Sequence, residues 1–420
     1  MMGIYKLLKE DMVTSLGCTE PAAVALAGAK AREILGVMPE KILIKCSQNI
    51  VKNVQGVAVP KAGVMKGISV ACILGCIAGK SAYGLEVLKD VKKSDLPILK
   101  RALKNKICQV SQLNSGDNLH IICFVQSGNH TAEVEIIHSH DNIISVKKDG
   151  RFIFRKRGVS KVNRNNLDKI KLTFDDIYCF ANTFEIEKLQ HLLAMEIKYN
   201  DAIAKEGLQH SYGAQVGKVI LEKAKGHAKE KIKAYAAAGS DARMSGCSMP
   251  VVISSGSGNQ GLLILSTVYR YSKYLGVSKE ILYRALVLAN LLGIWQKFYM
   301  GKLSAFCGAV NAAAAAGAAI TYMRGGTKKQ IANTVINVLA SAGGMWCDGA
   351  KPSCALKIAI AVDCAIIASD MAMSNNTFRS GDGIVKEGLE KTMASISHVV
   401  RTGMRQTDKK ILQVMLGELE

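Results

Sequence analysis

The chain has 420 residues, of which 49% are hydrophobic and 21% are charged, so we expect a folded protein with a large core and exclude a disordered one. The formal net charge of +21 raises nucleic acid as a partner. The lysines and arginines are nevertheless spread along the chain, and the dense patch from Lys147 to Lys171 carries no RNA-binding signature. We therefore expect a solvated basic face and no nucleic-acid partner.

Local composition excludes two further classes of protein. The N-terminal sequence MMGIYKLLKEDMV carries charges throughout and lacks the apolar core of a signal peptide. The least charged runs are residues 67–79, which are too short to span a bilayer, and residues 303–321, which are too rich in Ala and Gly to insert. We expect a cytoplasmic protein without membrane association, in which the twelve cysteines are reduced.

The predicted secondary structure changes character along the chain. Residues 1–36 predict two helices around a central turn, and residues 41–46 alternate like a strand. Helical spacing returns over residues 62–105. Residues 118–154 contain alternating runs, separated by Gly, Asn and Asp, that predict strands. From about residue 172 the pattern is helical nearly to the end.

These elements predict an α+β fold, in which a large, mainly helical catalytic body carries a smaller β-containing segment inserted near the N-terminus. We expect residues 1–40 to form the N-terminal helical part of the catalytic body, residues 41–155 to form the smaller α+β segment, and residues 156–420 to form the helical catalytic domain. A homodimer is compatible with the sequence, which does not determine the oligomeric state.

Cys18 lies in the stretch SLGCTEPAAVALA, directly before the start of an alanine-rich helix. Pro21 suits the first turn of that helix, because the amide hydrogen that proline lacks would have no intrahelical partner there. Cys18 would then lie at the positive end of the helix dipole, which lowers the pKa of a thiol and favours the thiolate. The alternative is a half-buried cysteine that packs as a small hydrophobic residue.

Three other cysteines lie in glycine-rich stretches. Cys307 lies in KLSAFCGAVNAAAAAG, and both Cys347 and Cys354 lie in SAGGMWCDGAKPSC. Gly349 and Pro352 prevent a continuous helix between the last two, so the chain can loop and bring their sulfur atoms together. Three thiolates without a fourth fit a [4Fe–4S] cluster with one open iron, whereas structural zinc takes four ligands at tighter spacing. Glycine-flanked cysteine loops also occur without metal.

Six stretches of the chain, taken together, are typical of one protein family, although no single stretch would be enough to identify it. They are SLGCTEPAAVALA, GNHTAEVEIIHSHDNI, DARMSGCSMPVVISSGSGNQG, CGAVNAAAAAGAA, GGMWCDGAKPSCALK, and SGDGIVKEGLE with the later GMRQTDKKIL. With them the chain resembles the iron–sulfur L-cysteine desulfidases, a group related to the α-chain of bacterial L-serine dehydratases, over essentially its whole length. The resemblance implies that Cys307, Cys347 and Cys354 ligate a [4Fe–4S] cluster and that Cys18 is the catalytic base.

The resemblance further implies an enzyme, a carbon–sulfur lyase that converts L-cysteine to pyruvate, ammonia and sulfide. The open iron would act as a Lewis acid, and a thiolate at a helix start would take the Cα proton. Cys18 could instead occupy the open iron at rest and be displaced by substrate. An L-serine dehydratase with the same cluster is the alternative function, and a cluster-free basic binding protein is a remote one. No lysine lies in a pyridoxal-phosphate context.

A second group of polar residues lies in SSGSGNQG, residues 254–261. Its three glycines allow successive backbone amides to form a concave anion site. We expect this loop to bind the carboxylate of a small amino-acid substrate, with Arg243 as a bidentate partner. An ordinary loop and a structural arginine are the alternatives. The candidate substrate-binding residues are Arg243, Ser255, Ser257, Gly258, Asn259 and Gln260.

The residues near these motifs give two further expectations, one about the positions of the histidines and one about the substrate. His138 and His140 alternate on a predicted strand, so they would share one face in a structural role or near the substrate, while His130 could cap a turn. The neighbours of the proposed site are small or apolar, which suits a thiol better than a hydroxyl. We therefore expect a higher kcat/KM for L-cysteine than for L-serine. These neighbours are Met244, Met249, Met345, Trp346 and the glycine–alanine helix after Cys307.

Overall fold

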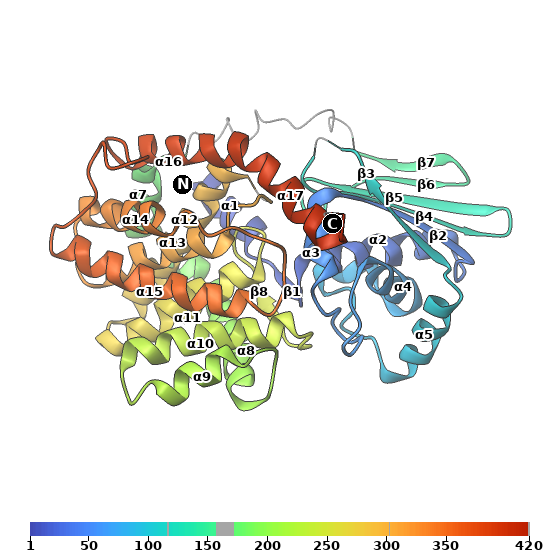
Figure 1. The fold of residues 1–420 in the computed structure, drawn as a ribbon, viewed down its shortest axis with the longest axis horizontal. Coiled ribbons are helices and arrows are strands. Elements are labelled where there is room, and N and C mark those ends of the chain that lie inside the picture. Colours follow the sequence, from blue (N-terminus) through green and yellow to red (C-terminus); the bar gives the residue numbers. More distant parts are fainter. Residues whose placement is uncertain (116, 157–171, 302, 419–420) are drawn as a thin grey trace.

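The computed structural model describes residues 1–115, 117–156, 172–301 and 303–418, and its fold is α+β with a mostly helical body (Figure 1). The predicted fold class is therefore confirmed. The buried hydrophobic residues form two large cores, one inside the helical body and one beneath a mixed sheet. Part of the predicted basic patch, residues 157–171, lies outside the described residues. None of the described helices is both long and apolar enough to cross a membrane.

The sheet has the strand order β3-β2-β4-β5-β6-β7, in which β2 and β3 pair in parallel and the other neighbours are antiparallel. The predicted strands are confirmed, but the sequence pattern does not predict β3, because CQVSQL is short and mostly polar. The strands are β2 (Lys41–Ser47), β3 (Cys108–Leu113), β4 (His120–Ser127), β5 (His130–Ile137), β6 (Ile143–Lys148) and β7 (Arg151–Arg155).

Helices cover one face of this sheet, which explains the alternation of its strands (Figure 1). Ile44 and Cys123 pair across β2 and β4, and both are fully buried. The two inner helices, α2 and α4, approach closely because a Cβ at Gly75 would lie only 2.2 Å from the carbonyl oxygen of Ala25. The helices on this side are α2 (Thr19–Leu35), α3 (Gln48–Gln55), α4 (Ile68–Ala78) and α5 (Leu96–Lys104).

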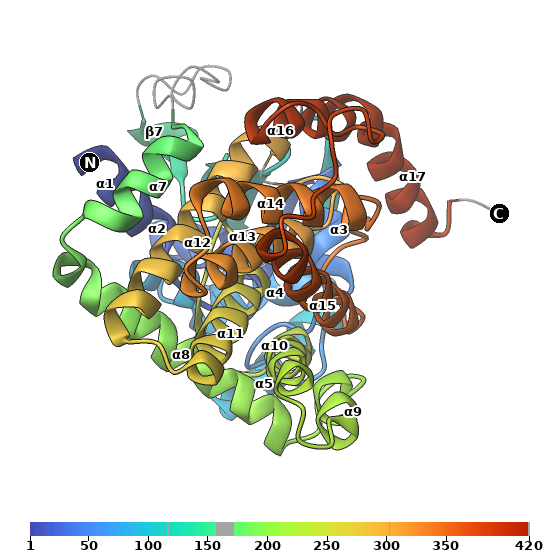
Figure 2. The ribbon, with the colours of Figure 1, turned by 90° about the vertical axis from the view of Figure 1, so that its left-hand side faces the viewer.

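The helical body is built around α13, in which residues 312–319 are all alanine or glycine (Figure 2). Its alanines and glycines let α11, α12, α14 and α15 pack directly against it. At Gly317, for example, a Cβ would lie 3.0 Å from the carbonyl oxygen of Ala365. The helices of the body are α1 (Met2–Asp11), α7 (Phe174–Thr183), α8 (Gln190–Gln209), α9 (Val216–Lys223), α10 (Ala228–Met244), α11 (Gly258–Leu275), α12 (Lys279–Met300), α13 (Gly308–Met323), α14 (Lys328–Ala342), α15 (Cys354–Met373) and α16 (Leu389–His398).

The chain crosses from one core to the other at Gly17. Strand β1 (Thr14–Leu16) pairs with β8 (Pro250–Val252) in the helical body, whereas α2 packs on the sheet. Gly17 has a φ of +68°, and a Cβ there would overlap the ring of Pro60, so the crossing requires glycine. The contacts of α2 therefore place it on the sheet side. The sequence pattern instead assigns residues 1–40 to the helical body. The division into domains stays a prediction.

The C-terminal helix returns toward the sheet side. Helix α17 (Met404–Leu416) extends from the body and contacts α3 (Figure 1). Lys52 of α3 is buried, and its Nζ lies 2.6 Å from Oδ1 of Asp408 on α17. The same Nζ donates a hydrogen bond to the carbonyl oxygen of Cys347 at 3.3 Å. One lysine thus links the sheet side, the C-terminal helix and a cysteine loop.

Candidate active site

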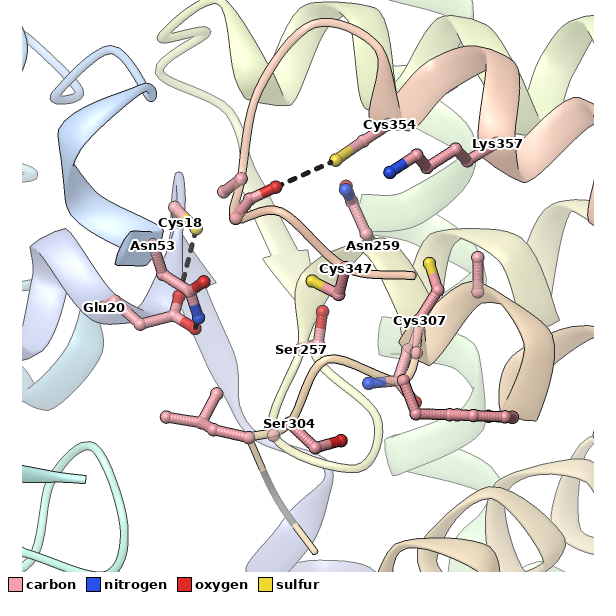
Figure 3. Close-up of a pocket in the computed structure, with 18 of the residues that line it drawn as sticks. Cys18, Glu20, Asn53, Ser257, Asn259, Ser304, Cys307, Cys347, Cys354 and Lys357 are labelled. Atoms are coloured by element: carbon pink, nitrogen blue, oxygen red, sulfur yellow. Dashed lines mark hydrogen bonds between the residues drawn. The ribbon is translucent and has the colours of Figure 1, made fainter. Parts of the chain in front are cut away.

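A cavity of about 110 Å³ lies between the two cores (Figure 3). Residues from α2 and α3 line it from the sheet side, and residues at the starts of α11, α13 and α15 line it from the helical body. The functional cysteines that the sequence predicts, Cys18, Cys307, Cys347 and Cys354, all line this one cavity. Other lining residues are Glu20, Asn53, Arg243, Ser257, Asn259, Gln260, Lys297, Ser304 and Lys357.

Four helices begin at the cavity. Cys18 is the N-cap of α2, Ser257 the N-cap of α11 and Cys307 the N-cap of α13. Cys354 is the first residue of α15. Each helix start presents unpaired amides and the positive end of its dipole, which favours anions. Three cations line the same space, so the cavity suits a negatively charged group. They are Arg243, Lys297 and Lys357.

Two of the cysteine loops are held together by their backbones. Phe306 and Trp346 form a short antiparallel bridge, and the Cys307 amide donates to the carbonyl oxygen of Met345 at 3.0 Å. The bridge places the residues that follow it, Cys307 and Cys347, at the cavity. Backbone hydrogen bonds therefore hold both cysteines at the cavity.

Cys354 reaches the cavity at the end of a loop that depends on glycine. Gly349 has a φ of +90°, and a Cβ there would lie 2.5 Å from the carbonyl oxygen of Lys52. The Cys354 thiol donates to the carbonyl oxygen of Gly349 at 3.7 Å. Because α15 begins only at Cys354, the predicted break between Cys347 and Cys354 is confirmed.

The three thiols of the helical body fit an iron–sulfur cluster by their chemistry. Burial, and then repulsion from Cys347, raise the pKa of Cys307 to about 12, and burial also raises the pKa of Cys354. In the described part of the chain, no group of three or more His, Cys, Asp or Glu side chains is arranged to hold a metal ion. Three thiols around a cavity that cationic side chains also line would suit an iron–sulfur cluster, whose irons deprotonate their cysteine ligands.

Cys18 has the predicted position but not the predicted acidity. Its buried thiol donates a hydrogen bond to Oε2 of Glu20 at 3.1 Å. Burial, and then the negative charge of Glu20, raise the pKa of Cys18 well above its ordinary value. The predicted lowering of this pKa is therefore wrong, because loss of water and a neighbouring carboxylate outweigh the helix dipole. Cys18 needs a proton acceptor before it can act as a base.

Glu20 is a site residue that the sequence analysis missed. Its Oε2 also accepts from Thr19 at 3.0 Å, its Oε1 accepts from Asn53 at 2.8 Å, and Nε2 of His140 lies 3.9 Å from Oε1. Burial acts to raise the pKa of Glu20, but His140 and the hydrogen bonds from Cys18 and Asn53 outweigh burial and hold it well below its usual range. The sequence signal is an acidic residue among apolar ones, which also fits a helix-dipole partner.

The glycine-rich loop does not form the anion site that we expect from its sequence. Ser254 and Ser257 pair with each other, and the Ser255 amide donates to Oδ2 of Asp11 at 2.5 Å. Ser255 and Gly256 both have positive φ, so the loop is a tight turn that uses its own amides. The amides without intrahelical partners belong instead to the first turn of α11. That turn contains Gly258, Asn259 and Gln260.

Arg243, near the end of α10, connects this helix start to Cys18. Its Nε donates to the carbonyl oxygen of Gly17 at 3.1 Å, and its Nη1 donates to Oδ1 of Asn259 at 3.1 Å. Its Nη2 is buried and has no hydrogen-bond partner among the described residues. A Cβ at Gly258 would lie 2.4 Å from Nε, so glycine makes room for the guanidinium. Arg243 therefore fixes the turn before Cys18 and offers a free donor.

A comparison with known families identifies the group to which the chain belongs. The model of the serine dehydratase alpha chain matches residues 83–413. The chain belongs to the serine dehydratase alpha-chain family. The related family inferred from the sequence is thereby confirmed. The matched region includes Arg243 and the three cysteines of the helical body but begins after Cys18 and Glu20.

Full-length relatives in the family also cover the N-terminal part of the site. A UPF0597 protein of Lachnoclostridium phytofermentans is 45% identical over 411 residues, which are 98% of each chain. A UPF0597 protein of Finegoldia magna is 43% identical over 418 residues, covering 99% of this chain and 100% of the relative. A UPF0597 protein of Treponema denticola is 42% identical over 419 residues, covering 98% and 97%.

The cavity of this serine dehydratase alpha-chain protein is partly lined by apolar residues, among them Gly308 and Ala309 of the expected glycine–alanine helix, but most of the apolar residues named from the sequence lie elsewhere. None of the four individually named residues, Met244, Met249, Met345 and Trp346, lines the cavity, and Trp346 is 58% exposed. Among the candidate substrate-binding residues, Ser255 and Gly258 also lie outside its lining. Sequence reasoning missed the polar residues that do line it, because each is isolated in its own element. They are Asn53, Lys297, Ser304 and Lys357.

One histidine of this family member lies beside the site. Strand β5 ends at Ile137, and His138 has a φ of +68°, so the predicted strand face shared by His138 and His140 is wrong. The turn directs His138 away and places His140, which is buried, next to Glu20. His130 begins β5 and is exposed.

Proposed function

We propose that this member of the serine dehydratase alpha-chain family is an iron–sulfur-dependent lyase that converts L-cysteine to pyruvate, ammonia and sulfide. The observation that carries the proposal is the meeting of Cys18, Cys307, Cys347 and Cys354 around one cavity with a free donor of Arg243. These residues come from distant parts of the chain, and core packing does not explain why four thiols, two of them buried, line one cavity together with three cationic side chains.

Cys307, Cys347 and Cys354 would hold a [4Fe–4S] cluster. When bound, the cluster would supply a Lewis acid at the iron that lacks a cysteine ligand. The residues around it contribute positive charge, from the helix starts of α13 and α15 and from Lys357, which stabilises thiolate ligands. Three cysteines, rather than four, leave room for a substrate atom.

Arg243 and the start of α11 would bind the substrate carboxylate. Nη2 of Arg243 has no hydrogen-bond partner among the described residues, and the N-cap of α11, Ser257, makes no side-chain cap hydrogen bond, so the first amides of that helix have no cap from it. A carboxylate accepts from such donors with charge-assisted hydrogen bonds. The hydrogen bond from Arg243 to Asn259 keeps the two donor groups together. The substrate's Cα would then lie between this anchor and the sheet side of the cavity.

Cys18 would take the Cα proton. Its thiol must first lose its own proton, and Glu20, which stays ionised, orients the thiol by accepting its hydrogen bond at 3.1 Å. After the Cα proton and the β-sulfur leave, the remaining enamine takes up water and releases ammonia as pyruvate forms. Apolar residues that line the cavity, among them Leu303, Phe306 and Ile358, support a thiol-bearing substrate.

L-Serine dehydration is the second candidate function. The family model carries the description serine dehydratase alpha chain. The cavity also contains hydrogen-bonding side chains, among them Ser304 and Asn259, that can satisfy a hydroxyl. The same residues would act on serine, with water in place of sulfide as the product.

Anaerobically purified protein tests the proposal. We expect a brown protein that contains iron and acid-labile sulfide in equal amounts and releases sulfide and pyruvate from L-cysteine with a higher kcat/KM than it releases pyruvate from L-serine. Serine preferred over cysteine would establish the dehydratase instead. A protein without iron after anaerobic reconstitution would refute the cluster and favour the cluster-free alternative.

A further inference from the structure

Glu20 is the acidic side chain among the described residues that line the cavity. Its carboxylate is buried, with a side-chain exposure of 9%, yet it accepts hydrogen bonds from neutral groups. Its ion-pair partner among the described residues is His140, whose Nε2 lies 3.9 Å from Oε1. A charged donor that approaches Oε1 more closely than His140 does would add to the charge compensation of this buried carboxylate.

The hydrogen bonds around Glu20 leave one acceptor position open. A carboxylate offers about four lone-pair positions. Oε2 accepts from the Cys18 thiol and the Thr19 hydroxyl, which fills that oxygen. Oε1 accepts only from Asn53 among the described residues, because Nε2 of His140 at 3.9 Å is beyond hydrogen-bond distance. One lone pair of Oε1 therefore has no donor.

We propose that Glu20 binds the α-ammonium group of the amino-acid substrate through Oε1. This inference rests on the proposed function, and it makes the α-amino acid, rather than any thiol acid, the class of ligand that the cavity selects. An ammonium group donates charge-assisted hydrogen bonds, which an ionised carboxylate accepts strongly. The site then holds a zwitterion at both charges, with Glu20 on the sheet side and Arg243 on the body side.

The two anchors also orient the substrate for the base. Cys18 is hydrogen-bonded to Glu20 and lies directly after Gly17, whose carbonyl accepts from Arg243. The side chain that would take the Cα proton is thus positioned by both groups that would hold the substrate's charges. Three contacts at one carbon, to the ammonium, the carboxylate and the hydrogen, define one stereoisomer. We therefore expect selection for the L-amino acid over its mirror image.

A pair of ligands tests the proposal on the cluster-containing protein. L-Cysteine and 3-mercaptopropionate share a carboxylate and a thiol, but the second has no ammonium group. We expect wild-type protein to bind L-cysteine, measured as KM, about 10- to 100-fold more tightly than 3-mercaptopropionate, measured as an inhibition constant. In Glu20→Gln, this ratio should fall to near one, while the inhibition constant for 3-mercaptopropionate changes little. Calorimetric titration with unreactive L-2-aminobutyrate and butyrate provides the same ratio without turnover.

Two further variants separate binding from folding. Glu33→Gln removes an exposed carboxylate of the same helix and should leave both constants unchanged. Glu20→Asp keeps the charge on a shorter side chain and should retain part of the preference for the ammonium ligand. Equal weakening of both ligands in Glu20→Gln, or a wild-type ratio near one, would overturn the assignment of Glu20. Failure of wild-type protein to bind either amino acid would instead overturn the proposed function, and the assignment with it.

Discussion

Replacing Arg243 with lysine keeps the positive charge but removes the geometry of the guanidinium. Nε and Nη1 each make a hydrogen bond within the protein, and Nη2 is buried without a hydrogen-bond partner among the described residues. One ammonium group can replace only part of this set. The loss of one charge-assisted hydrogen bond to the substrate carboxylate is worth about 1.5 to 3 kcal/mol, which corresponds to an increase of about 10- to 150-fold in KM for L-cysteine.

An ester separates carboxylate binding from a structural role of Arg243. L-Cysteine ethyl ester keeps the thiol and the amine but has no anionic carboxylate. Wild-type protein should prefer the free acid to the ester, and Arg243→Lys should lose that preference, so steady-state kinetics with both substrates measures the effect. If KM for acid and ester rises by the same factor, Arg243 only supports the turn at Gly17 and the carboxylate assignment is wrong.

Three further outcomes follow from the described contacts. Cys18→Ser should keep its iron and lose about 100- to 10,000-fold in kcat, because a serine hydroxyl cannot supply a base at neutral pH; loss of iron would instead make Cys18 a cluster ligand. Cys354→Ser should lose iron, measured by metal analysis. The control is Cys364→Ser, which changes a cysteine of the same helix outside the cavity lining and should keep its iron. A full cluster in Cys354→Ser would contradict the three-ligand arrangement. Glu196 is fully buried against Asn290, and burial raises its pKa to about 8 from an ordinary 4.5, so its contribution to stability is complete below pH 4.5 and is lost as pH rises to 8. Glu196→Gln should therefore exceed wild type by about 3 kcal/mol in free energy of unfolding at pH 7 but by less than about 1 kcal/mol at pH 5, measured by urea unfolding, and equal gains at both pH values would contradict the raised pKa.

The sequence predicted the cysteines of the site better than their surroundings. Glycines and a proline between Cys347 and Cys354 exclude a helix there, so the sequence itself indicates that both thiols can reach one space. The position of Cys18 at a helix start likewise depends on local residues. The raised pKa of Cys18 does not depend on local sequence alone. It depends on burial and on the rotamer of Glu20, which only the tertiary structure determines.

The substrate side of the cavity was less accessible to sequence reasoning. The glycines of residues 254–261 are compatible with an anion-binding loop and with a tight turn, and only the pairing of Ser254 with Ser257 decides for the turn. Asn53 and Lys297 come from separate helices, and no local pattern connects either of them with a cysteine loop. His140 lies near Glu20 because β5 ends early, which the alternation of residues does not predict.

The distance in sequence between Cys18 and Cys354 has a consequence for biosynthesis. The two residues are separated by 354 − 18 = 336 positions. At a translation rate of roughly 5 to 20 residues per second, the ribosome needs roughly 17 to 67 s to pass from one to the other. If the cavity holds the proposed cluster, the last ligand emerges only when most of the chain has been made. Cofactor loading is then a late step, and chains truncated before α15 should emerge without iron.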